Sequence, residues 1–135
     1  MAIKYVFAPD VKKLVKEILD CLDFFHIPHQ YVLCFRSKGS ASKRIIARIH
    51  GLYKIWQEAL NLSPYYIIEV ISEQYDKLTK KEKEKVLIHE LLHIPKKFTG
   101  GFRPHKGYID TKIVEKYYLI LQKQRVNKKR ILNTV

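Results

Sequence analysis

The chain has 135 residues, 47% of them hydrophobic and 12% aromatic, which fits one folded domain and excludes a disordered or low-complexity protein. With 26 Lys and Arg against 13 Asp and Glu, the formal net charge is +13. The excess cations are either solvated surface residues with no further role, or they attract nucleic acid, an acidic protein or an acidic membrane surface. Apolar runs end well before ~18 residues, no signal peptide opens the chain, and Cys21 and Cys34 form no disulfide or CxxC pattern, so we expect a cytoplasmic protein without a membrane span.

The first predicted element is an amphipathic helix over residues 10–25, because apolar residues recur there at helical spacing. Asp10 is placed to cap its N-terminus, and Pro28 prevents its continuation. The expected inner face consists of Val11, Leu14, Val15, Ile18, Leu19, Leu22 and Phe25.

A small sheet is expected next, since β-branched and aromatic runs at residues 31–35, 45–49 and 65–72 each predict a strand. The polar stretch at 37–42 predicts a turn or loop. Residues 52–60 combine strand and helix signals, so three or four strands are expected in all.

A second helix begins at a clear signal, in which Thr79 and Glu82 form a capping box ahead of an apolar run. Pro95 and the Gly100-Gly101 pair end this element, and residues 98–107 are predicted to form a loop.

A last helix is predicted from about residue 110 to 125, and the basic residues that follow are expected to be frayed or extended. The fold class is thus α+β, with a single domain over residues 1–122 and a basic C-terminal tail over 123–135. The basic residues of this tail are Lys123, Arg125, Lys128, Lys129 and Arg130.

The capped helix contains the motif His89-Glu90-Leu91-Leu92-His93, which reads HExxH. Residues i and i+4 lie one above the other on a helix, so two imidazoles at this spacing can reach one Zn²⁺. Glu90 follows the first ligand and can act as a general base on a water molecule that the zinc activates. A bare HExxH also arises by chance, but here it lies on a helix that the flanking apolar residues predict independently.

A catalytic zinc usually has three protein ligands. His105 is the preferred third ligand, because it lies in a loop rich in Gly and Pro that has no evident packing role. Glu115 and Asp110 are the alternatives, although Glu115 is flanked by Lys112 and Lys116 and is expected to be a solvated helix residue.

The segment from Val86 to Gly107 resembles the small predicted metallopeptidases of archaea and their viruses and phages, which look like minimal relatives of the SprT-like zincins. The resemblance covers roughly residues 30–121. It implies a zincin-like arrangement: an N-terminal helix, a small, mostly antiparallel sheet, the HExxH helix and a closing helix, with a third histidine in the loop before that helix. A peptide or protein substrate is implied.

Further roles are less specific. Arg103 and Tyr108 flank the third ligand and are candidates for stabilising an oxyanion, and residues 67–71 are a candidate edge strand for binding an extended peptide. His26, His29 and His50 lack ligand spacing and are expected to be structural or surface residues.

A rival interpretation is a basic nucleic-acid-associated protein in which the zinc site is mainly structural. A compromise between the two interpretations is a SprT-like protease acting on proteins bound to DNA. Besides the tail, its candidate contact residues are Arg36, Lys38, Lys43 and Arg44.

Overall fold

Four strands and five α-helices make up the described part of the chain, which in this computed structural model comprises residues 2–24, 26–105 and 109–134. In chain order these are β1 (Lys4–Phe7), α1 (Pro9–Cys21), β2 (Val32–Lys38), β3 (Ala47–Gly51), α2 (Lys54–Leu60), β4 (Tyr66–Ile71), α3 (Ser72–Tyr75), α4 (Lys80–Leu92) and α5 (Thr111–Thr134). A 3₁₀ helix, η1 (His29–Tyr31), precedes β2. The predicted α+β class, with an N-terminal helix, the motif helix and a closing helix, is confirmed.

The strands form one mixed sheet in the order β1-β2-β4-β3. The β1–β2 and β4–β3 pairs are antiparallel, whereas β2 and β4 are parallel, so the sheet is mostly antiparallel as predicted. β4 lies inside the sheet, and the prediction of an edge strand over 67–71 is therefore wrong. The two edges of the sheet are β1 and β3.

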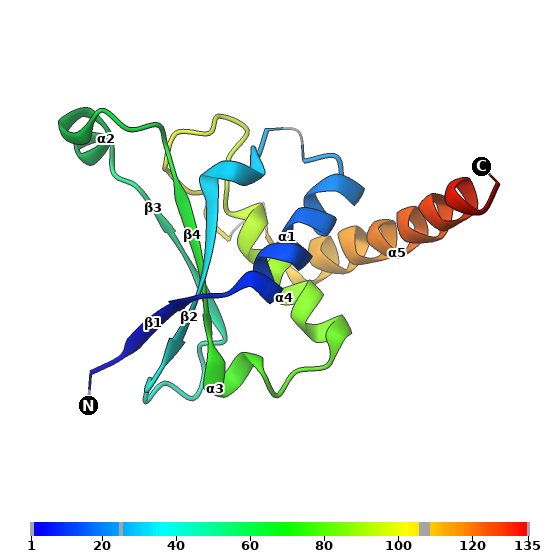
Figure 1. The fold of residues 1–135 in the computed structure, drawn as a ribbon, viewed down its shortest axis with the longest axis horizontal. Coiled ribbons are helices and arrows are strands. Elements are labelled where there is room, and N and C mark those ends of the chain that lie inside the picture. The colour runs from blue at the N-terminus through cyan, green and yellow to red at the C-terminus, as the bar shows by residue number, and fades with distance from the viewer. Residues whose placement is uncertain (1, 25, 106–108, 135) are drawn as a thin grey trace.

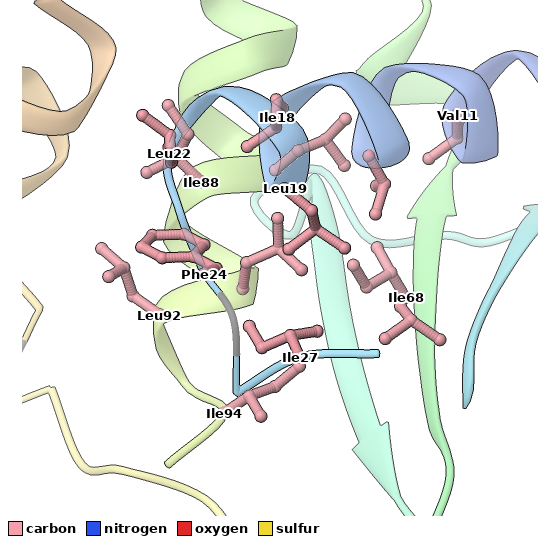
Figure 2. Close-up of a cluster of buried hydrophobic side chains, with 14 of the residues drawn as sticks. Val11, Ile18, Leu19, Leu22, Phe24, Ile27, Ile68, Ile88, Leu92 and Ile94 are labelled. Atoms are coloured by element: carbon pink, nitrogen blue, oxygen red, sulfur yellow. The ribbon is translucent and has the colours of Figure 1, made fainter. Parts of the chain in front are cut away.

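One face of the sheet is covered by α1, α4 and α5 (Figure 1). The core forms between these helices and the strands: Val11 and Ile18 of α1, Ile68 of β4 and Ile88 of α4 are fully buried (Figure 2). Each such side chain contributes about 1.5–3 kcal/mol through removal of its apolar surface from water. This packing fixes α4 against the sheet.

The motif helix α4 begins as predicted. Thr79 Oγ1 accepts a hydrogen bond from the Glu82 amide at 3.2 Å, and the Glu82 carboxylate accepts one from the Thr79 amide at 3.0 Å, which completes the capping box. Besides apolar residues, α4 buries two carboxyl groups, Glu84 and Glu90. Because α4 is buried on several sides, packing restricts the positions of its side chains.

Four local features of the structure settle or correct the predictions. The ambiguous residues 52–60 contain the helix α2, and β1 was not predicted because its four residues are all exposed and show no inside–outside alternation. Asp10 does not cap α1, whose N-cap residue is Ala8; its carboxylate instead accepts two hydrogen bonds from Arg36 at 2.7 and 2.8 Å. α1 ends at Cys21, and Phe25 lies outside the described residues.

The closing helix α5 continues to Thr134, so the prediction of a frayed or extended segment after residue 122 is wrong. Arg125 explains part of this continuation, because it pairs with Glu17 of α1 and Glu84 of α4, each at 2.5 Å. The C-terminal half of α5 extends past the rest of the molecule (Figure 1). Among the described residues, no helix combines the length and the apolar character that crossing a membrane requires.

Candidate metal centre

Three histidines converge at the end of α4. His89 lies in the last turns of the helix, His93 at its C-cap, and His105 on the loop that follows. One ring nitrogen from each lies within 4.8 Å of the others, and the Nε2 atoms of His89 and His105 are 3.2 Å apart. The structure therefore brings together the three residues that the sequence singled out.

The backbone of the loop orients His93. Its Nδ1 lies 3.0 Å from the Arg103 carbonyl oxygen, and since a carbonyl only accepts, Nδ1 carries the proton and donates it. The Arg103 amide donates in turn to the His93 carbonyl at 2.7 Å. These contacts leave Nε2 of His93 as the nitrogen available to a metal ion, in the usual manner of a ligand whose other ring nitrogen is held by a hydrogen bond.

The loop that carries His105 is tied to the rest of the molecule through two buried side chains that sequence reasoning missed. The Tyr66 hydroxyl donates to the Gly101 carbonyl at 2.7 Å and accepts from the Gly100 amide at 2.9 Å. Gln57 donates from Nε2 to the carbonyls of Leu52 and Thr99, both at 2.8 Å. A lone Tyr in a strand and a lone Gln in a helix form no motif, so no local signal marks this role.

Two glycines allow this loop to lie directly on the end of β3. A Cβ at Gly51 would come within 2.1 Å of the Gly100 carbonyl oxygen. Gly100 has a φ of +96°, and a Cβ there would meet the Leu52 carbonyl oxygen at 2.3 Å. Only glycine fits either position. The sequence pattern predicts that Gly100 helps to end a helix, whereas the structure shows that it is required by this close contact between backbones.

The environment of the cluster favours neutral imidazoles. Burial lowers the pKa of His89, and the neighbouring His93 and His105 lower it further. Burial also lowers the pKa of His93, a shift that its bond to the Arg103 carbonyl opposes. Neutral imidazole is the form that binds metal, so the site favours the state it needs.

Glu90 lies beside the cluster in a different environment. Its side chain is 8% exposed, and burial raises the pKa of its carboxyl group to about 7. In the part of the chain that the structure describes, no cation forms an ion pair with this carboxyl group. A carboxyl group with a pKa near neutrality can both accept and return a proton, which is what a general base requires.

The histidines and Glu90 open into a cleft of about 970 Å³. Residues 44–49, which lead into and along the edge strand β3, form one wall, and the loop at 102–105 with the start of α5 forms another. The cleft is therefore bordered by an edge strand of the described sheet and by the candidate metal centre.

The alternative ligands have other partners. Glu115 lines the cleft but forms an ion pair with Lys85 and is not among the clustered donors. Asp110 accepts a hydrogen bond from the Ile113 amide at 2.8 Å and so caps α5. The Nε2 atom of His50 lies 2.8 Å from Glu69, in agreement with a structural role, and Tyr108 lies outside the described residues.

Three imidazoles whose ring nitrogens lie this close together are typical of a metal site. The chain matches the model of the family described as "Putative phage metallopeptidase" over residues 3–129 and belongs to that family, which confirms the predicted resemblance to a metallopeptidase family. Membership supports a peptidase function, with a metal ion and a peptide or protein substrate. No curated protein and no solved structure shows significant similarity to the chain.

Proposed function

We propose that this protein is a zinc-dependent peptidase of zincin-like type, in which His89, His93 and His105 hold Zn²⁺ and Glu90 is the general base. One observation carries the proposal: three imidazole nitrogens lie within 4.8 Å of one another in the same cleft as a buried carboxyl group that has no ion-pair partner in the described residues. The family membership adds the peptidase activity.

The donor set fits zinc. In a tetrahedral site with Zn–N distances of ~2.0–2.1 Å, two ligand nitrogens are separated by roughly 3.3 Å. The Nε2 atoms of His89 and His105 lie 3.2 Å apart. Three imidazoles also leave one tetrahedral position free, as a catalytic site needs.

The chemistry proposed is hydrolysis of a peptide bond. Zinc, when bound, would lower the pKa of a water molecule and polarise the scissile carbonyl. Glu90 accepts the proton that this water loses on attack and then delivers it to the leaving amine, so the carboxylate is regenerated. Arg103 lines the cleft and remains the candidate among the described residues for stabilising the oxyanion.

The edge strand β3 suggests how a substrate binds. Its outer edge carries backbone groups that the sheet does not use, and its residues line the cleft that contains the histidines. An extended peptide adding to this edge would place its backbone next to Glu90. The proposed substrate is therefore an unfolded or loop segment of a protein.

Activity of the protein should depend on metal. We expect cleavage of casein or of a mixed peptide library by the purified protein, loss of that cleavage after treatment with a chelator, and recovery on addition of zinc. Peptide products are measured by mass spectrometry. Cleavage that persists fully after chelation, with zinc absent by elemental analysis, would contradict the zinc mechanism.

A second prediction concerns the third ligand. Loss of a group that only orients a metal ligand typically lowers metal affinity 10–100-fold. Because His105 is itself proposed as a ligand, His105→Ala should lower zinc affinity by more than ~100-fold. Glu115→Gln should leave the affinity nearly unchanged, because Glu115 pairs with Lys85. Competition with a fluorescent zinc chelator measures both. The opposite ranking would move this protein to the zincins with a glutamate ligand.

A further inference from the structure

A second concave surface lies between α1 and α5, beside the N-terminus of α4. This groove of about 730 Å³ shares no lining residue with the cleft of the metal centre. Its charged residues are mostly basic: Lys13, Lys16, Lys80, Arg125, Lys128 and Lys129.

The acidic residues that line this α1–α5 groove do not neutralise the charge of its basic residues. Glu17 is used by Arg125, which also pairs with Glu84. Asp20 is the other acidic residue that lines the groove. Within the described residues, none of the five lysines has a carboxylate oxygen within 4 Å of its ammonium group, whereas Lys54 and Lys85 elsewhere do.

The lysines come from three elements that only the fold brings together. Lys13 and Lys16 lie one turn apart on the exposed side of α1, Lys80 opens α4, and Lys128 and Lys129 lie on the part of α5 that continues past Arg125. Like charges gathered around one hollow repel one another, and an anion with several charges that enters the hollow relieves this repulsion. The groove is thus built for a polyanion.

We propose that the α1–α5 groove binds the phosphate backbone of a nucleic acid. A bilayer surface is flat on this scale and cannot reach the floor of a groove, whereas a phosphodiester strand can lie along it and meet lysines on both sides. Val126 and Leu132 also line the groove, with 54% and 75% of their surface exposed, and offer apolar contact to the sugars. Nucleic acid and a peptide substrate can then be bound at the same time on separate surfaces.

Two arginines in the basic segments named from the sequence have structural roles instead. Arg125 holds α5 against α1 and α4, and Arg36 binds Asp10 and Asp76. The positive charge that the groove can offer to an anionic ligand is therefore that of its lysines.

Fluorescence anisotropy with a labelled DNA duplex and a labelled single strand tests the proposal. Five lysine contacts give a slope of log K against log salt of up to about −4.5 on the duplex. Lys128→Gln/Lys129→Gln should weaken binding at least ~10-fold at 0.1 M salt and reduce that slope by about 2. Lys13→Gln/Lys16→Gln, on the other helix, should act in the same way.

The matched control is Lys96→Gln/Lys97→Gln, which removes the same charge from two adjacent exposed lysines beyond the other end of α4. It should retain the affinity of the unmodified chain. Equal losses in all three variants, binding to anionic vesicles but to neither DNA, or no DNA binding at all would overturn the proposal. The assay needs no metal, so a failed peptidase assay leaves it unaffected, and the groove variants should cleave casein as the unmodified chain does.

Discussion

The double variant His89→Ala/His93→Ala should contain no zinc after purification without chelator, whereas the unmodified chain should contain about one zinc per molecule. The variant keeps one of the three imidazoles, and the zinc affinity of a single imidazole is too low for the metal to stay bound during purification. Elemental analysis by mass spectrometry, normalised to protein concentration, measures this directly.

His29→Ala is the matched control for this experiment. His29 is exposed and lies in η1, outside the cluster, so its removal should leave the zinc content unchanged. Full zinc occupancy in the double variant would show that the metal is held elsewhere and would exclude the proposed centre.

Glu90→Gln should separate metal binding from catalysis. Glutamine keeps the shape and polarity of the side chain but cannot accept the proton, so peptidase activity should fall by at least ~10²-fold. Zinc content should remain close to that of the unmodified chain, because Glu90 supplies none of the clustered donor atoms. The melting temperature should not fall, because a neutral amide costs less to bury than a carboxylate. Initial rates on a peptide identified in the casein or library assay give the comparison.

Glu115→Gln provides the control, since it makes the same chemical change at another glutamate that lines the same cleft. It should retain activity. If Glu90→Gln also retains activity, then the carboxylate is not the base and the hydrolytic mechanism proposed above is wrong.

The motif helix was the most predictable part of the fold. Its capping box is a local signal that short-range hydrogen bonds satisfy, and the structure contains both of them. β1 and the end of α5 were not predictable in this way, because long-range contacts stabilise them. β1 pairs with the distant β2, and Arg125 is held by Glu17, from which it is 108 residues away in sequence.

In the candidate metal centre, too, one part follows from local sequence and another part depends on long-range contacts. The spacing of His89 and His93 follows from helix geometry alone. That His105 lies beside them depends on the Tyr66 and Gln57 hydrogen bonds to the loop and on the contact of Gly51 with Gly100. Tyr66 and Gln57 lie far from the loop in sequence and carry no motif, so their part in the site becomes visible only in three dimensions.

The two buried carboxyl groups of α4 have opposite consequences for folding. Glu84 forms an ion pair with the guanidinium of Arg125, which also pairs with Glu17 and so links α1, α4 and α5. Glu90, six positions further along the same helix, is buried with no such counter-charge among the described residues, and removing a carboxylate from water without compensation lowers the free energy of unfolding. The same helix thus buries one glutamate with a counter-charge and one without, and the role proposed for Glu90 would place this cost in stability at the residue that moves the proton.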